Sequence, residues 1–157
     1  MIREFEKKRL LKIDFCNKQL ILRKKFVKRT EILVIPKNEL LTIFKTLGYK
    51  FTYATGGIYN YDGITYKDYK FLMYFQIKYN SPLAYMPIFK DGKLMETGIT
   101  QFGSVLRFLP YDESLINNNF GINSVQEMQE YLKGLIDLFH EFVDEYIKEI
   151  VAGNLPE

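Results

Sequence analysis

Residues 54–79 read ATGGIYNYDGITYKDYKFLMYFQIKY, and they contain six of the 12 tyrosines of the chain. In the second half of this stretch every other side chain is large and apolar: Phe71, Met73, Phe75, Ile77 and Tyr79. Alternation with a period of two is typical of a β-strand that buries one face. The stretch therefore predicts a long strand with one well-buried face.

Two Asp-Gly dipeptides, Asp62-Gly63 and Asp91-Gly92, predict tight turns around this strand, because glycine accepts the positive φ of a hairpin turn. A two-residue loop at Asp62-Gly63 would place four side chains on one surface of a hairpin. These are Tyr59, Tyr61, Ile64 and Tyr66. Pro87 lacks a backbone N–H, so the strand LAYMPIF either lies at an edge or is broken there. We predict a further strand at VLRFL, residues 105–109.

The C-terminal segment predicts a long amphipathic helix. Ser124 and Glu127 have the spacing of a capping box, and apolar residues then recur at steps of three and four as far as Ile150. Acidic residues fall on the opposite side, which we expect to face water: Glu127, Glu130, Asp137, Glu141, Asp144, Glu145 and Glu149. A shorter helix is predicted near 38–47, where Leu40, Leu41, Phe44 and Leu47 share a face.

The N-terminal segment has two interpretations. Alternation of Leu11, Ile13 and Phe15 favours a β-hairpin, whereas the spacing of Ile2, Phe5 and Arg9 favours a helix over 2–16. We favour the hairpin. The expected fold is a single α+β domain over residues 1–157, with an antiparallel meander of about five to seven strands and its helices on one face.

Composition narrows the classes of function. A single cysteine, Cys16, cannot form an internal disulfide, and together with a single histidine, His140, it does not supply the ligands of a conventional zinc site. We find no GxSxG, HExxH or CxxC pattern, so we expect no catalytic residue, no metal and no cofactor. The charged start of the chain and the lack of a long apolar run predict a cytoplasmic protein that does not span a membrane.

The two ends of the chain carry opposite net charge. Residues 1–30 carry 11 Lys or Arg against three acids, whereas residues 124–157 carry eight acids against two lysines. The two ends either lie against each other or present opposite faces to different partners, and we favour the first arrangement.

Three sets of residues are candidates for binding. The hairpin tyrosines could form an aromatic platform, although we favour an aromatic ladder packed on the sheet: Tyr59, Tyr61 and Tyr66. The acidic helix face could dock a basic protein: Asp137, Glu141, Asp144 and Glu145. The basic segment could bind phosphates: Lys24, Lys25, Lys28 and Arg29.

The order of features in residues 38–151 resembles small cytosolic bacterial immunity proteins. The resemblance rests on four features in this order: a short helix ending in LGYKF, the segment GGIYNYDG, the strand YKFLMYFQIKY and the acidic helix LIDLFHEFVDEYIKEI. The resemblance implies a non-enzymatic protein that binds and neutralises a partner toxin. The alternative is a nucleic-acid-binding domain that uses the basic segment together with the hairpin tyrosines.

Overall fold

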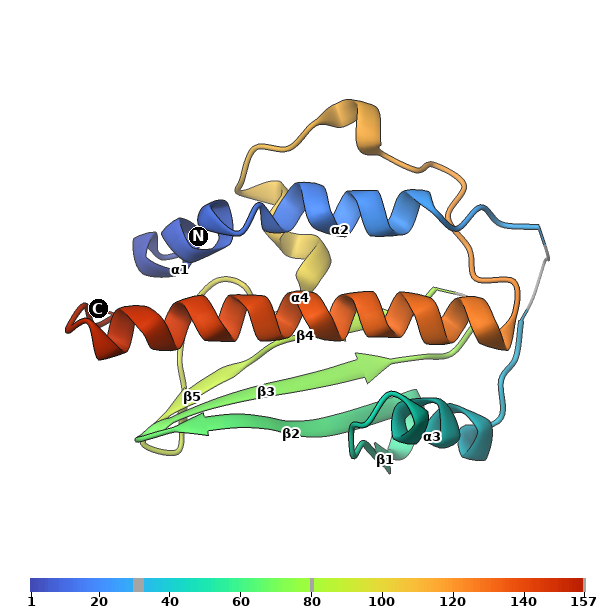
Figure 1. Cartoon of the computed structure of the whole chain (residues 1–157), viewed down its shortest axis with the longest axis horizontal. Helices are drawn as coiled ribbons and strands as arrows, with labels where there is room; N and C mark the ends of the chain where they lie inside the picture. Colours follow the sequence, from blue (N-terminus) through green and yellow to red (C-terminus); the bar gives the residue numbers. More distant parts are fainter. Residues whose placement is uncertain (30–32, 80, 157) are drawn as a thin grey trace.

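The structure, a computed structural model, describes residues 1–29, 33–79 and 81–156. Its longest element is helix α4 (Val125–Val151), which runs along the whole length of the molecule (Figure 1). The Ser124 hydroxyl accepts a 3.1 Å hydrogen bond from the Glu127 N–H, as the sequence predicts. The Glu127 carboxylate does not return to Ser124 but accepts a 3.1 Å bond from the Asn123 N–H.

A six-stranded antiparallel sheet lies beside α4, which confirms the α+β prediction. The strand order is β1-β2-β3-β5-β6, and β4 also pairs with β3. The strands are β1 (Thr52–Ala54), β2 (Ile58–Tyr66), β3 (Tyr69–Gln76), β4 (Leu83–Tyr85), β5 (Ile88–Lys90) and β6 (Lys93–Leu94). The chain also forms short 3₁₀ turns at Thr55–Gly57, Phe102–Arg107 and Glu113–Leu115.

Strand β3 supplies the predicted buried face, since Phe71, Met73 and Phe75 are at most 1% exposed. The prediction is wrong at its end: the strand stops at Gln76, and Tyr79 beyond it is 60% exposed.

The predicted turn at Asp62-Gly63 is also wrong. Strand β2 continues through this dipeptide with a register irregularity between Tyr61 and Ile64, and the chain turns at Lys67-Asp68 instead. Two residues of β2, Asp62 and Gly63, face the single Leu72 of β3, so Tyr61 lies opposite Met73 and Ile64 lies opposite Phe71. The expected four side chains therefore do share one face, but it is the face that packs against the helices.

The region after β3 is partly as predicted. Asp91 and Gly92 have positive φ and join β5 to β6, with Lys90 opposite Lys93. The strand around Pro87 is broken into β4 and β5, which both pair with β3. The predicted strand at 105–109 is wrong, because Phe102–Arg107 forms a 3₁₀ turn that buries Phe102 and Val105 at helical spacing.

The preferred N-terminal hairpin is wrong as well. The N-terminal segment forms two helices, α1 (Glu4–Lys12) and α2 (Phe15–Lys24). Between them Asp14 adopts a φ of 56°. Leu11, which the hairpin would bury, is 45% exposed, whereas Leu10 is fully buried. The N-terminal side chains that are buried against α4 recur at helical spacing and not at every second residue, because α4 offers a long surface to an adjacent helix.

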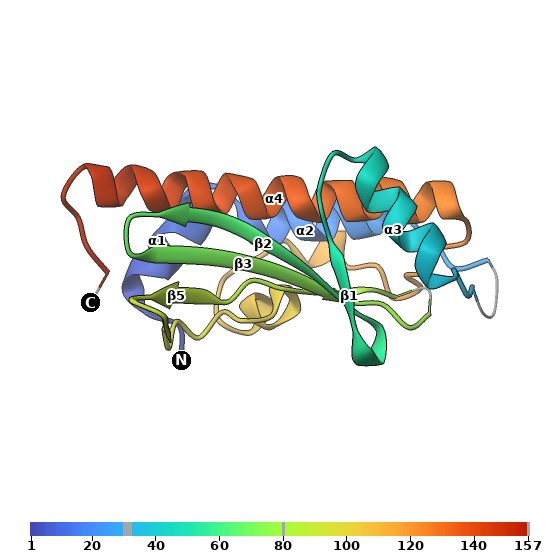
Figure 2. The ribbon, with the colours of Figure 1, turned by 90° about the horizontal axis from the view of Figure 1, so that it is seen from below.

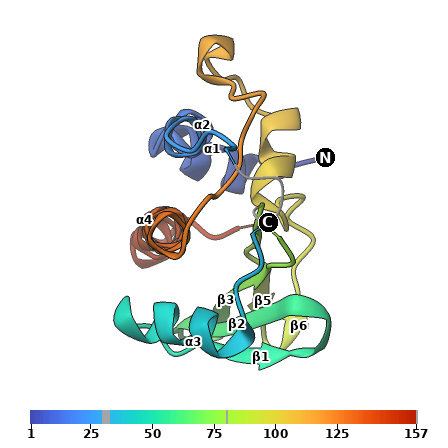
Figure 3. The ribbon, with the colours of Figure 1, turned by 90° about the vertical axis from the view of Figure 1, so that its right-hand side faces the viewer.

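Helix α3 (Lys37–Thr46) matches the predicted short helix. It lies on the same side of the sheet as α4. The Phe44 ring stacks on Phe51, with 3.9 Å between ring centroids, and is tilted against the Tyr59 ring at 5.8 Å. Figure 3 shows α1 and α2 on the opposite side of α4 from α3 and β1. Figure 2 shows the edge strand β1 next to α3.

Candidate functional site

The predicted aromatic platform faces inward. Tyr59 is 3% exposed, and burial together with the neighbouring Tyr53 raises its pKa. Tyr61 is half-buried between Phe51, at 5.2 Å between ring centroids, and His140, at 6.1 Å. Burial of Tyr61 also raises its pKa. These two rings are thus held by the core and not offered to a partner.

The third predicted tyrosine lies elsewhere. Tyr66 is half-buried at the far end of β2, opposite Tyr69, with the Lys67 ammonium 5.5 Å from its ring centroid. The predicted platform of three rings is therefore not formed as one open surface.

Three acidic residues of α4 pair with cations of α1 and α2, which corrects for these three the expectation that the acidic face only meets water: Glu141, Glu145 and Glu149. Lys12 pairs with Glu145 at 2.9 Å, and Lys18 pairs with Glu141. Lys12 and burial act in opposite directions on Glu145, and the net effect holds the pKa of Glu145 below its usual range. The basic N-terminal and acidic C-terminal segments therefore lie against each other, as the sequence favours.

Two predicted acidic residues stay at the surface of α4. Asp137 pairs with Lys133 of the same helix at 2.7 Å, and both carboxylate and ammonium are more than half exposed. Asp144 is exposed, and the described parts of the chain place no cation within ion-pair distance of it.

The predicted basic residues lie near the end of α2. Lys24 donates a 3.1 Å hydrogen bond to the Ser114 carbonyl, and Arg29 pairs with Glu127 at 2.8 Å. Lys25 and Lys28 are exposed. Half of the proposed phosphate-binding set is therefore already bonded within the chain.

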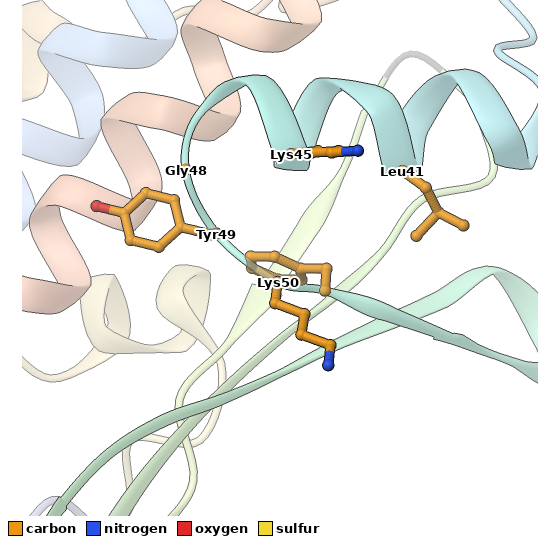
Figure 4. Close-up of a pocket in the computed structure, with 6 residues that line it drawn as sticks. Leu41, Lys45, Gly48, Tyr49 and Lys50 are labelled. Carbon is orange, nitrogen blue, oxygen red and sulfur yellow. The ribbon is translucent and has the colours of Figure 1, made fainter.

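A surface that the sequence did not single out lies between α3 and residues 48–51, the segment that leads into β1. We call it the α3–β1 groove; it has a volume of about 500 Å³ and is lined by Leu41, Lys45, Gly48, Tyr49, Lys50 and Phe51. Figure 4 shows Leu41 and Lys45 along α3, with Lys50 across the opening, whereas the Tyr49 ring points away toward α4. The groove combines an apolar floor with a basic rim.

The floor of the groove is fixed by aromatic packing. Phe51, which is 6% exposed, stacks on Phe44, and Tyr49 stacks at 5.4 Å on His140 of α4. Tyr61 meets Tyr49 edge-on at 5.5 Å. Ring contacts of this kind contribute roughly 0.5–1.5 kcal/mol each beyond burial. The groove is therefore a preformed feature of the core and not a gap between independent segments.

Exposed lysines lie in and beside the groove: Lys45 and Lys50 line it, and Lys37 lies earlier on α3. Lys37, Leu41 and Lys45 recur every four residues, so they lie on one face of α3. The Lys37 ammonium lies 5.1 Å from the ring centroid of Tyr53, which is 43% exposed on β1. Lys45 and Lys50 are exposed. Across residues 1–29, 33–79 and 81–156, none of these three lysines forms an ion pair.

The groove borders a free edge of the sheet, since β1 ends the strand order. Tyr66 and Tyr69 flank the two-residue turn, so their backbones form a hydrogen-bonded pair. Along β3 the backbone N–H and C=O groups point alternately toward β2 and away from it. Phe75 therefore points toward β2 as Tyr69 does, and forms a hydrogen-bonded pair with Tyr59. The backbone of Asn60 consequently faces β1 and bonds to Thr52. The N–H and C=O of Tyr53 therefore point away from β2, toward the open edge.

The described residues contain no group of three or more His, Cys, Asp and Glu side chains arranged to hold a metal ion. In the same part of the chain, no helix combines the length and the apolar character that a bilayer crossing requires.

No protein-family model, curated protein or solved structure matches this chain.

Sequence reasoning missed the α3–β1 groove for an identifiable reason. The i, i+4, i+8 spacing of Lys37, Leu41 and Lys45 was visible in the sequence and is a signal for one helix face. Nothing in the sequence places that face next to Tyr53 and Lys50, because the contact depends on how α3 crosses β1.

Proposed function

We propose that this protein is a non-enzymatic binding protein that neutralises a partner protein, in the manner of an immunity protein acting on a toxin. The observation that carries the proposal is the α3–β1 groove, a preformed apolar surface lined by Lys45 and Lys50, with the exposed ring of Tyr53 beside it. Interfaces concentrate their binding energy in a few such apolar and aromatic anchors surrounded by polar groups. The resemblance in feature order to immunity proteins supports the same class of partner.

The ion pairs of the N-terminal helices favour a protein partner over a nucleic acid. Lys12 and Lys18 are engaged by acids of α4, and Arg9 lies 3.7 Å from Glu149. In each such pair a carboxylate neutralises the positive charge locally, so this charge is less able to bind a phosphate group. The basic segment thus contributes less to a polyanion-binding surface than its composition suggests.

Co-purification from the native cells tests the proposal. We expect the tagged full chain to retain one protein in a fixed ratio, and we expect that protein to arrest growth when it is produced alone. Co-production of this chain should relieve the arrest. The proposal fails if no stable partner is retained and the products of the neighbouring genes are harmless.

The nucleic-acid alternative is tested by titrating mixed RNA and DNA at two salt concentrations. Electrostatic binding weakens steeply as salt rises, because counterions are released on association. Binding that is strong at low salt and lost in a Lys25→Glu, Lys28→Glu variant would favour that alternative over the protein partner.

A further inference from the structure

We propose that the α3–β1 groove takes an extended acidic segment of the partner, which pairs with β1 as an added strand. The inference rests on the proposed function and specifies how the partner is held. Strand addition to a free sheet edge is a common mode of peptide recognition, in which backbone hydrogen bonds supply affinity and side-chain pockets supply specificity.

The backbone of Tyr53 supplies the pairing groups. Its N–H and C=O point toward the open edge, and no described residue forms a hydrogen bond with either group. An unpaired strand edge is a template for another chain, which proteins usually block or cover. Here the described chain leaves the edge open beside a groove.

Charge defines the partner segment. Lys45 and Lys50 line the groove, and Lys37 lies beside the Tyr53 ring next to it. All three lack ion pairs within the described ranges. A segment that carries Glu or Asp at alternate positions would place carboxylates beside these ammonium groups, and complementary charge also speeds encounter. A basic segment would meet three like charges and be rejected.

Apolar side chains of the groove define the remaining positions of the segment. Alternate residues of an added strand point to one face of the sheet. On the α3 side they would meet Leu41, the ring of Phe51 and the half-exposed ring of Tyr53. The segment that fits best therefore alternates acidic and branched or aromatic residues.

A peptide backbone fits this edge better than a nucleic acid does. The outward N–H and C=O of Tyr53 form a donor and acceptor pair that a neighbouring strand matches, whereas a phosphodiester backbone offers acceptors only. Single-stranded nucleic acids are held mainly by stacking on exposed rings. The rim of the groove presents one half-exposed ring, Tyr53, while Phe51 is buried.

Two substitutions at Tyr53 separate backbone pairing from side-chain contact. Tyr53→Pro removes the outward N–H, and since this N–H does not bond β2, the existing ladder is retained. Tyr53→Val removes the same ring but keeps the N–H. Thermal melting of both variants checks that they fold. We expect Tyr53→Pro to weaken binding by at least about tenfold more than Tyr53→Val, as expected for a lost interfacial hydrogen bond.

The probe is a short synthetic peptide that alternates glutamate with isoleucine, together with a version in which lysine replaces every glutamate. Both are titrated into the isotope-labelled full chain and followed by amide NMR. We expect the acidic peptide alone to shift the β1 resonances and to slow hydrogen exchange of the Tyr53 amide. A single-stranded oligonucleotide is titrated in parallel.

Charge-reversal variants provide the matched control. Lys37→Glu, Lys45→Glu and Lys50→Glu combined should abolish binding of the acidic peptide. Lys25→Glu, Lys28→Glu and Lys93→Glu combined change the net charge equally at exposed positions outside the groove, and they should leave binding unchanged. Equal loss in both triple variants would show that only total charge matters, and would overturn the inference.

The remaining outcomes are also decisive. Absence of any β1 shift, equal binding of the two peptides, equal binding by Tyr53→Pro and Tyr53→Val, or oligonucleotide binding in the groove would each overturn the inference. Repeating the native co-purification with the two Tyr53 variants separates the two proposals. If wild type retains no partner, the proposed function fails; if Tyr53→Pro retains the partner as well as Tyr53→Val does, only strand addition fails.

Discussion

The Tyr146 hydroxyl of α4 donates a 2.7 Å hydrogen bond to the Glu6 carboxylate of α1, and both side chains are fully buried. The Arg3 guanidinium donates two more bonds to the same carboxylate, at 2.6 and 2.7 Å. A buried charge is tolerated only when it is paired and hydrogen-bonded, so this network connects the N-terminal helix to the core.

Tyr146→Phe should lower the free energy of unfolding by about 1–3 kcal/mol, because the buried Glu6 carboxylate would lose one of its donors. Tyr74→Phe is the matched control, since Tyr74 is half-buried and its hydroxyl forms no hydrogen bond with any described residue. Denaturant unfolding of the two variants measures the difference. Equal effects would contradict a special role for the Glu6 contact.

The free energy of unfolding should fall at alkaline pH, and ionisation of Tyr146 should contribute to this fall. Burial, followed by the nearby Glu6 charge, raises the pKa of Tyr146 above its ordinary value of 10.0. A raised folded-state pKa means that the unfolded chain loses this proton first, so the stabilisation is full below pH 10 and is lost as pH rises further. The slope should be about 1.4 kcal/mol per pH unit for this group. The slope should be smaller in Tyr146→Phe, and an unchanged slope would contradict the assignment.

Gly63 and Gly92 offer a matched pair with different surroundings. Both have positive φ, at 67° and 77°, but a Cβ at Gly63 would lie 1.7 Å from the Phe71 carbonyl oxygen, whereas one at Gly92 would meet nothing within 4 Å. Gly92→Ala should cost about 1–2 kcal/mol, from the left-handed conformation alone. Gly63→Ala should cost distinctly more or prevent folding, because backbone atoms of β3 must move. Similar melting temperatures would contradict this account of the β2 irregularity.

Gly134 lets α2 approach α4 closely. A Cβ at this position would lie 2.6 Å from both methyl carbons of Leu22. In a Leu22→Ala background, Gly134→Ala should stabilise the protein by up to about 1 kcal/mol, from helix propensity alone. In the wild-type background the displaced Leu22 offsets this gain. We expect a coupling of roughly 0.5–3 kcal/mol between the two sites in a double-mutant cycle; additive effects would contradict the contact.

The Lys12 and Glu145 pair tests the contact between the charged ends of the chain. Lys12→Glu should lower the melting temperature, because it places like charges where the ammonium and carboxylate now lie 2.9 Å apart. Adding Glu145→Lys should recover most of the loss by restoring opposite charges. Lys8→Glu, at an exposed position of α1 without an ion pair among the described residues, is the control. Failure of the charge swap to recover stability would contradict the pairing.

Elements with strong local signals were predictable. The Ser124 cap and a 27-residue amphipathic stripe define α4, and the alternation at Phe71, Met73 and Phe75 defines the buried face of β3. Both patterns extend over many residues, so competing local preferences do not overturn them.

Elements with weak or conflicting signals were decided by packing. Asp62-Gly63 has the composition of a hairpin turn, yet continued pairing with β3 draws it into β2, and the turn forms at Lys67-Asp68. The alternation of Leu11, Ile13 and Phe15 suits a strand, yet α4 provides a surface that helices α1 and α2 cover more completely. In each case burial of apolar area outweighed a local preference of at most about 1 kcal/mol.

The sequence by itself therefore determined the fold class, the long C-terminal helix, the buried face of β3 and the attraction between the basic and acidic ends. Only the tertiary structure decided that Tyr59 is buried in the core with Tyr61 packed against it, and that Lys45 and Lys50 line a groove beside Lys37 and Tyr53. The reason is physical: periodicity reports which face of an element is apolar, but the crossing of α3 over β1 sets which faces meet, and it depends on packing between distant segments.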